Sequence, residues 1–147
     1  MQIDGQCGCG AVRFVLEGPT GMAAHCHCAS CRAFSGAAFL TWTKVPLARF
    51  TCEGEEAVRW HRSSDTIRWG FFGTCGTTLF YRADAAGHPE APSVDAIYVT
   101  MGSLRGELDR KPSMHVSFEE HVPWFEPGDA LPRFVGKSSV PYADDRT

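Results

Sequence analysis

The residues best suited to chemistry in this sequence are its cysteines, three of which stand close together. Cys26, Cys28 and Cys31 combine the C-x-C and C-x-x-C spacings, and both spacings allow thiolates to reach a single metal ion. Zinc takes thiolates into a tetrahedron at about 2.3 Å, so three protein ligands leave one position open. An open position is typical of a catalytic zinc, because a substrate can bind there. We therefore predict that these three cysteines hold a metal at which a reaction occurs.

An open three-cysteine site is suited to a thiol substrate. Three thiolates give a bound Zn²⁺ a net negative charge, which makes it a weaker Lewis acid than a zinc held by three histidines. The site can still bind a substrate thiol as its thiolate, because ligation to a metal deprotonates thiols. His25 and His27 alternate with the cysteines, and we expect their side chains to point elsewhere. A histidine as the fourth ligand is the alternative, and it would close the site.

A second group of cysteines has weaker spacing. Cys7 and Cys9 form a C-x-C pair between glycines, which let the backbone curl around a metal where a Cβ atom would clash. The alternative is a glycine-rich turn with two buried thiols. Cys75, which precedes a glycine, is a natural third ligand if the sheet folds it toward the pair. Cys52 has no partner in the sequence, and we interpret it as a buried thiol.

Composition and charge limit the class of protein. The chain has 147 residues with 14 basic and 17 acidic side chains, a net charge of −3. Its basic residues are scattered, whereas nucleic-acid binding needs them clustered against phosphates. We see no apolar run of about 20 residues that could span a membrane and no secretory signal at the N-terminus. We therefore expect no nucleic-acid or membrane partner and a cytoplasmic protein, whose cysteines would bind metal rather than form disulfides.

The elements that must position these cysteines are short strands. Strand-like runs of β-branched and aromatic residues, separated by glycine-rich turns, occupy 11–16, 37–42, 58–62, 66–72, 77–81 and 96–101. Helical periodicity is scarce, so the pattern predicts a mainly β domain of short antiparallel strands. We expect 115–134 to pack over the sheet as extended chain. The domain would span 2–134, and 135–147 would be a polar, flexible tail.

The cysteine motifs together resemble the glutathione-dependent formaldehyde-activating enzyme family, which also includes centromere protein V. The resemblance covers 2–134 and rests on three motifs in order, since three spaced motifs are hard to obtain by chance. They are Gly5-x-Cys7-x-Cys9-Gly10-Ala11-Val12-Arg13-Phe14, then Cys26-His27-Cys28-x-x-Cys31, then Phe71-x-x-x-Cys75-Gly76-Thr77. The stretch from His121 to Pro132 is also similar to the end of the family's domain.

The resemblance implies a β-tent fold with two zinc sites, one structural and one open. The structural ligands would be Cys7, Cys9 and Cys75, and the open zinc on Cys26, Cys28 and Cys31 would carry the reaction. That reaction is a carbon–sulfur lyase chemistry, the reversible joining of a thiol such as glutathione to an aldehyde such as formaldehyde. The partners implied are therefore a small thiol and a small aldehyde.

One position departs from the family. The family's C-x-x-C before Gly-Thr reads Phe72-x-x-Cys75 in this chain, so the structural site loses one thiolate. Either water or another side chain completes that site, or its zinc is weak or absent. A phenylalanine here could instead fill the space as core. The chain is long enough to keep an apolar core without this metal, so we expect one or two zinc ions per chain.

Two functions follow from these observations. The first is the zinc-dependent lyase, with no identifiable general acid or base. Its thiol would need cationic contacts if it carries carboxylates, and the candidates are Arg13, Arg32, Arg59, Arg62 and Arg68. The alternative is a non-catalytic, zinc-stabilised binding module that docks partners around Trp124 and Phe125.

Overall fold

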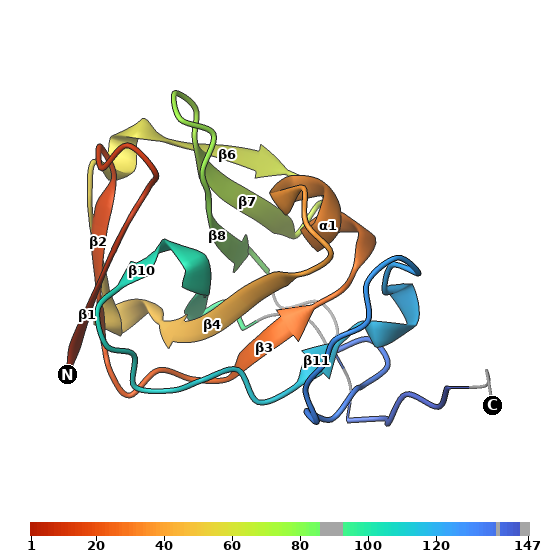
Figure 1. Cartoon of the computed structure of the whole chain (residues 1–147). Helices are drawn as coiled ribbons and strands as arrows, with labels where there is room; N and C mark the ends of the chain where they lie inside the picture. The colour runs from red at the N-terminus through yellow and green to blue at the C-terminus, as the bar shows by residue number, and fades with distance from the viewer. Residues whose placement is uncertain (86–92, 138, 145–147) are drawn as a thin grey trace.

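Two sheets form the framework of the protein in this computed structural model, which describes residues 1–85, 93–137 and 139–144 (Figure 1). The smaller sheet has the strand order β10-β1-β2-β5, and every pair in it is antiparallel. Its strands are β1 (Gln2–Gln6), β2 (Arg13–Glu17), β5 (Phe50–Glu53) and β10 (Leu104–Arg105). Its β1–β2 hairpin carries the C-x-C pair in its turn.

The larger sheet has the strand order β11-β3-β4-β9-β8-β7-β6. All its pairs are antiparallel except β11 with β3, which run parallel. Its strands are β3 (Ala23–Cys26), β4 (Leu40–Pro46), β6 (Val58–Arg62), β7 (Ile67–Phe72), β8 (Thr78–Ala83), β9 (Ala96–Thr100) and β11 (His115–Val116). Short 3-10 turns occupy Leu47–Arg49, Glu55–Ala57, Met101–Ser103 and Phe118–Glu120.

These sheets confirm the prediction of a mainly β protein, and β6 has the bounds that the sequence predicted. Helix α1 (Ala29–Ser35) was not predicted from the sequence. Its seven residues make about two turns, which is too few for a 3.6-residue period to stand out. The helix begins after Cys28 and ends at Gly36, whose φ of 66° is the left-handed conformation that glycine adopts without strain.

The main hydrophobic core lies between the two sheets. Inward-facing residues of the first hairpin pack here against the larger sheet, among them Phe14, whose ring meets that of Phe80 edge to face at 5.1 Å. The ring of Phe14 lies over Gly5, where any Cβ atom would collide with it. Each fully buried Phe contributes about 2–3 kcal/mol by burial. This packing fixes the hairpin, and with it the position of the C-x-C turn.

The chain after β11 folds back beside that strand at the edge of the larger sheet, where the backbone N–H of Phe134 donates to the His115 carbonyl. Ser117 donates its backbone N–H to the carbonyl of Gly136 at 2.6 Å, and the ring of Tyr142 contacts that of Phe118 at 5.0 Å. These contacts hold the described part of 135–147 against the domain. Residues 138 and 145–147 lie outside the described residues, and both the tail and the domain limits stay predictions. Among the described residues, no helix has the length and apolar character needed to cross a membrane.

Candidate metal centres

The structure gathers six of the seven cysteines into two groups of three. We name Cys7, Cys9 and Cys75 the outer triad, and Cys26, Cys28 and Cys31 the cavity triad. Within each triad the sulfur atoms lie within 4.8 Å of one another. Two sulfurs bound to one zinc at about 2.3 Å are at most about 4.6 Å apart. Small side-chain rotations therefore suffice to place both donor sets around a zinc ion, and both triads fit this metal.

The cavity triad forms where a strand passes into a helix. Cys26 is the last residue of β3 and pairs with Leu40 of β4 and Val116 of β11. Cys28 is the N-cap of α1, and its sulfur accepts a hydrogen bond from the backbone N–H of Cys31 at 3.3 Å. Strand, cap and first helical turn thus each supply one ligand. Because the backbone changes direction between Cys26 and Cys31, the three sulfurs come together despite lying on different elements.

The cavity triad is largely shielded from solvent. Cys26 and Cys31 are buried and Cys28 is half-buried. The indole Nε1–H of Trp42 donates to the sulfur of Cys31 at 3.4 Å. Hydrogen bonding to Cys28 raises the pKa of the Cys26 thiol to about 11, and bonds from Cys26 and Cys31 lower the pKa of Cys28. Negative charge therefore forms first on Cys28, which has the backbone donor beside it.

A chain of polar side chains runs from beside the cavity triad to the surface, with His27 and His115 buried and Asp129 exposed. The Nε2 atom of His27 is 2.8 Å from Nδ1 of His115, and Nε2 of His115 is 3.1 Å from a carboxylate oxygen of Asp129. His25 instead bonds the hydroxyl of Thr41 at 2.7 Å. Burial lowers the pKa of His27 to about 4, so this ring is neutral at pH 7. Neither His25 nor His27 belongs to the group of ligand atoms.

The outer triad joins two hairpin turns. The sulfurs of Cys7 and Cys9 are 3.6 Å apart in the β1–β2 turn, and Cys75 lies in the β7–β8 turn. The backbone N–H of Gly8 donates to the Thr77 hydroxyl at 2.8 Å, which ties the two turns together. Cys7 is buried, but Cys9 and Cys75 are exposed. This triad therefore faces solvent on two of its three ligands.

Phe72 stands where the family has a fourth cysteine, and it packs against the main core, whose buried residues include Cys7. The side chain thus fills apolar space, which was one of the alternatives that the sequence left open. The Thr77 hydroxyl lies 3.1 Å from the sulfur of Cys75, and this hydrogen bond lowers the pKa of Cys75 to about 6. The exposed thiol is therefore largely ionised at pH 7. Cys52, which the sequence suggested was buried, is half-buried in β5.

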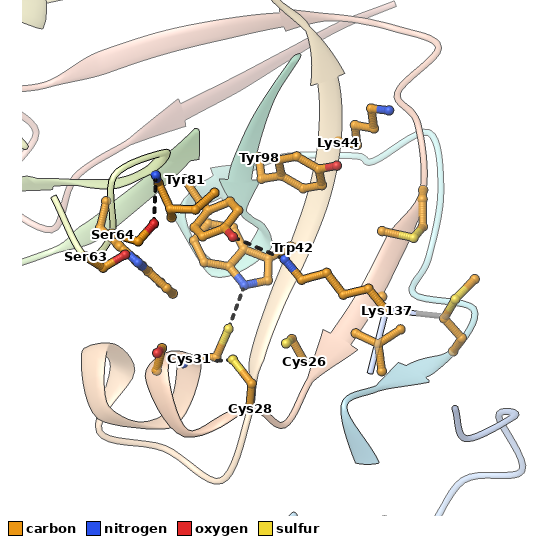
Figure 2. A pocket seen from close by; sticks show the side chains of 17 residues that line it. Cys26, Cys28, Cys31, Trp42, Lys44, Ser63, Ser64, Tyr81, Tyr98 and Lys137 are labelled. Atoms are coloured by element: carbon orange, nitrogen blue, oxygen red, sulfur yellow. Dashed lines mark hydrogen bonds between the residues drawn. The ribbon is translucent and has the colours of Figure 1, made fainter. Parts of the chain in front are cut away.

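A cavity of about 580 Å³ opens beside the cavity triad (Figure 2). Aromatic and apolar side chains make most of its wall, with three serines and two lysines. The described residues that line it are Met22, Ala24, Cys26, Cys28, Ser30, Cys31, Trp42, Lys44, Ser63, Ser64, Ile67, Trp69, Tyr81, Tyr98, Met114, Val116 and Lys137. No carboxylate occurs among these described residues, so the cavity is positively charged in a chain whose net charge is negative.

The cationic residues of this cavity are not those that the sequence suggested. None of the five candidate arginines lines it. Arg62 and Arg68 instead bind the carboxylate of Asp84 at 3.0 Å and 2.9 Å. Lys44 and Lys137 take their place, and no motif pointed to either, because only the folded sheet brings them to the cysteines.

Comparison with known proteins finds a family match over the part of the chain that contains both cysteine triads. The family model described as glutathione-dependent formaldehyde-activating enzyme matches residues 2–120. The chain belongs to this family. A crystal structure of a Rhodobacter sphaeroides protein is similar in fold, with a TM-score of 0.57 and 22% sequence identity over 72% of this chain and 91% of that chain. No curated protein matches the sequence. Family membership supports an enzyme of the formaldehyde-activating kind, with cysteine clusters able to hold zinc.

Proposed function

We propose that this protein is a zinc-dependent carbon–sulfur lyase that reversibly joins a thiol such as glutathione to a small aldehyde such as formaldehyde. The observation that carries the proposal is the opening of a three-cysteine cluster onto a cavity of about 580 Å³. A fourth protein ligand would have closed that position, and no other ligand side chain joins the cluster among the described residues. Membership of the formaldehyde-activating family supports the choice of substrates.

Zinc held by Cys26, Cys28 and Cys31 would supply an open coordination position that favours the thiolate form of a substrate thiol. The protein's own contribution is to bind and orient the two partners. The main gain in rate comes from holding thiolate and aldehyde together in one cavity, because the two partners then react from an oriented complex and need not meet in solution. The Trp42 N–H stabilises negative charge on Cys31, and the aromatic wall excludes water from the reacting groups.

The charge of the cavity favours an anionic thiol. Glutathione carries two carboxylates and one ammonium group, and Lys44 lies on the cavity wall on the far side of Tyr98 from the triad (Figure 2). Its ammonium group would pair with a carboxylate while the thiol reaches the triad. All seven cysteines are free thiols, which fits a protein that works in the reducing cytoplasm.

A second candidate function is the non-catalytic binding module. It is favoured by one observation, the side chain of Trp124, which is 70% exposed beside the 42% exposed Phe125. Exposed aromatic side chains of this size are common anchors at protein interfaces. This function does not account for an open cysteine cluster beside a cationic cavity, so we rank it second.

Exchange of isotope-labelled formaldehyde with glutathione tests the proposal. Two-dimensional NMR exchange spectroscopy would measure the rate at which hydrated ¹³C-formaldehyde and S-hydroxymethylglutathione interconvert. The expected result is an exchange rate that rises in proportion to the concentration of zinc-loaded protein. Cys28→Ser is the inactive control, and Cys52→Ser is matched to it because Cys52 lies in β5, outside both triads. Exchange that stays at its uncatalysed rate would favour the binding module.

A further inference from the structure

The exposed Lys137 meets the half-buried Tyr81 at the mouth of the cavity, and both residues line it together with the cavity triad (Figure 2). The Nζ atom of Lys137 donates a hydrogen bond to the Tyr81 hydroxyl at 3.2 Å. Because that bond occupies a lone pair of the phenol oxygen, the phenolic proton is free to be given to another acceptor. The proposed reaction needs such a donor, since it turns a carbonyl oxygen into a hydroxyl, and the sequence offered no candidate for it.

We propose that Tyr81 is the proton donor of the thiol–aldehyde reaction and that Lys137 stabilises the phenolate that Tyr81 becomes. This inference rests on the proposed function and deepens it. It assigns the acid–base group of the site to residues that no cysteine motif contains. Tyr81 would touch the reacting oxygen, whereas Lys137 would act through Tyr81.

The chemistry balances with these two residues. The thiolate sulfur forms a bond to the carbonyl carbon, and the π electron pair of the carbonyl moves to its oxygen. That oxygen takes the phenolic proton of Tyr81, which gives the hydroxyl of the thiohemiacetal. The proton that the thiol lost on entering the site returns through solvent to the phenolate. In the reverse direction the phenolate removes the hydroxyl proton, the carbon–sulfur bond breaks, and the thiolate leaves.

The environment of both groups suits these roles. Burial raises the pKa of Tyr81 above its ordinary value, so the phenol is protonated and ready to donate at neutral pH. Desolvation at the cavity wall opposes the charge of Lys137, but its interaction and hydrogen bond with Tyr81 outweigh this and raise its pKa, so it remains an ammonium. The ammonium also lies 4.7 Å from the centre of the Tyr81 ring. A cation this close stabilises a phenolate more than a phenol.

The wall of the cavity fixes the direction of Tyr81. Its ring meets Trp69 edge to face at 5.0 Å and is tilted against Trp42 at 5.9 Å. Trp42 is also the residue that donates to Cys31, so one indole touches both the triad and the tyrosine. The adjacent tyrosine, Tyr98, meets the Tyr81 ring edge to face at 5.8 Å and lines the same cavity, but the Lys137 hydrogen bond goes to Tyr81. The two tyrosines therefore form a matched pair for experiment.

Lys137 reaches this position because the chain before it is anchored. The carboxylate of Glu119 accepts the backbone N–H of Gly136 at 2.9 Å, and Gly136 returns its carbonyl to the N–H of Ser117. Gly136 has a φ of 55°, a conformation that other residues adopt only with strain. These hydrogen bonds of Gly136 direct the side chain of the next residue, Lys137, across the mouth of the cavity.

The test is the NMR exchange assay with variants of the two residues in the zinc-loaded full chain. Tyr81→Phe keeps the ring and removes the proton, and we expect its turnover number to fall about 100-fold, a typical contribution of general acid–base catalysis. Its KM for glutathione should change less than about threefold, because the phenol acts on the oxygen and not on thiol binding. Tyr98→Phe, the matched variant, should lose at most about threefold in turnover number.

Variants of Lys137 separate a role in chemistry from a role in structure. Lys137→Met should lower the turnover number about tenfold or more, and Lys137→Arg should recover most of it because the positive charge returns. Equal losses in Lys137→Met and Lys137→Arg, or equal rates in Tyr81→Phe and Tyr98→Phe, would overturn the inference while wild-type catalysis upholds the proposed function. A wild-type protein that gives no acceleration would overturn both.

Discussion

The two cysteine triads have the same three-thiol composition but opposite surroundings. The cavity triad has two buried sulfurs, an indole donor and a cavity with two lysines. The outer triad has two exposed sulfurs at hairpin turns, and the strand after its second turn touches the end of α1, where the Thr78 hydroxyl donates to the Phe34 carbonyl at 2.8 Å. Each lacks a fourth protein ligand among the described residues, but for different reasons. In the cavity triad the free coordination position faces the cavity. Beside the outer triad, Phe72 stands where a fourth ligand would be and packs against the core.

We infer from this difference that an open coordination position is not enough for a reactive site. A catalytic metal needs a shielded space in which a substrate can bind, with groups placed to stabilise developing charge. The cavity triad has both, while the outer triad is linked only to Thr77 and the two turns. We therefore propose that the reaction takes place at the cavity triad and that the outer triad holds the two hairpins together.

The largest expected effect comes from removing one ligand from each triad. Cys28→Ser should lower the rate constant for formaldehyde–glutathione exchange by at least about 100-fold. Loss of a residue that only hydrogen-bonds to a metal ligand already lowers metal affinity or activity by about 10–100-fold, and Cys28 is itself a ligand. Cys75→Ser should change that rate less than about threefold but should lower the melting temperature by a few degrees. Exchange NMR and thermal unfolding measure the two effects. Equal loss of activity in both variants would contradict the assignment.

Alkylation of the metal-free protein should separate the exposed thiols from the half-buried Cys52. Burial raises the pKa of Cys52 to about 11, whereas the Thr77 hydroxyl lowers that of Cys75 to about 6. At pH 7 Cys75 is mostly thiolate and Cys52 is not. The lower intrinsic nucleophilicity of Cys75 offsets part of the gain, so we expect Cys75 to react about 100-fold faster. Mass spectrometry after iodoacetamide treatment would measure the two rates.

The sign of the pH dependence makes this prediction sharper. Raising the pH from 7 to 9 should barely change the alkylation of Cys75, since it is already ionised above its pKa of about 6. The same rise should increase the alkylation of Cys52 about 100-fold, because its thiolate fraction grows tenfold per pH unit below its pKa. Parallel increases at the two cysteines would contradict the environments described for them.

Restoring the missing cysteine should strengthen the outer triad. Phe72→Cys would complete a four-thiolate set, and we expect it to raise zinc affinity there by about tenfold or more. The metal-free variant should lose about 1–3 kcal/mol of stability, because Phe72 is partly buried in the core. Competition with a coloured zinc chelator measures the affinity. Phe71→Cys is the matched control, since neighbouring side chains on a strand face opposite sides.

The smallest expected effect lies in the hydrogen bond from Trp42 to Cys31. Trp42→Phe keeps an aromatic wall but removes the Nε1–H donor. The sulfur of Cys31 then becomes a stronger donor to the metal. In protein loaded with Co²⁺, this should shift the sulfur-to-cobalt charge-transfer band to longer wavelength by a few nanometres. A band that stays in place would show that the indole does not influence the ligand.

Sequence reasoning was most successful where the chemistry is local. Cys26, Cys28 and Cys31 are six residues end to end, so their spacing alone brought the sulfurs within reach of one ion. The strand at 58–62 was found because its residues favour extended chain and turn signals bound it. Helix α1 was missed because it is short, and because its N-cap is a cysteine rather than the Ser, Thr, Asp or Asn that mark helix starts.

The rest of the site depends on contacts between distant segments. Lys137 lies within 135–147, which the sequence predicted to be a polar, flexible tail, yet its side chain binds Tyr81 of β8 in the larger sheet. No local sequence pattern predicts the contact between Lys137 and Tyr81. The candidate arginines were chosen for charge alone, and sequence cannot tell which face of a strand will line a cavity. Arg62 and Arg68 proved to bind Asp84 instead.

The most direct test of the account is thiol binding to cobalt-loaded protein with one triad at a time. Cys75→Ser retains the complete cavity triad, and Cys28→Ser retains the complete outer triad. Adding glutathione to the Cys75→Ser protein should raise the sulfur-to-cobalt absorbance by about one third, because a fourth thiolate joins three. The Cys28→Ser protein should show no comparable rise at the same glutathione concentration. A rise confined to the Cys28→Ser protein would place the reactive metal at the outer triad and contradict the assignment.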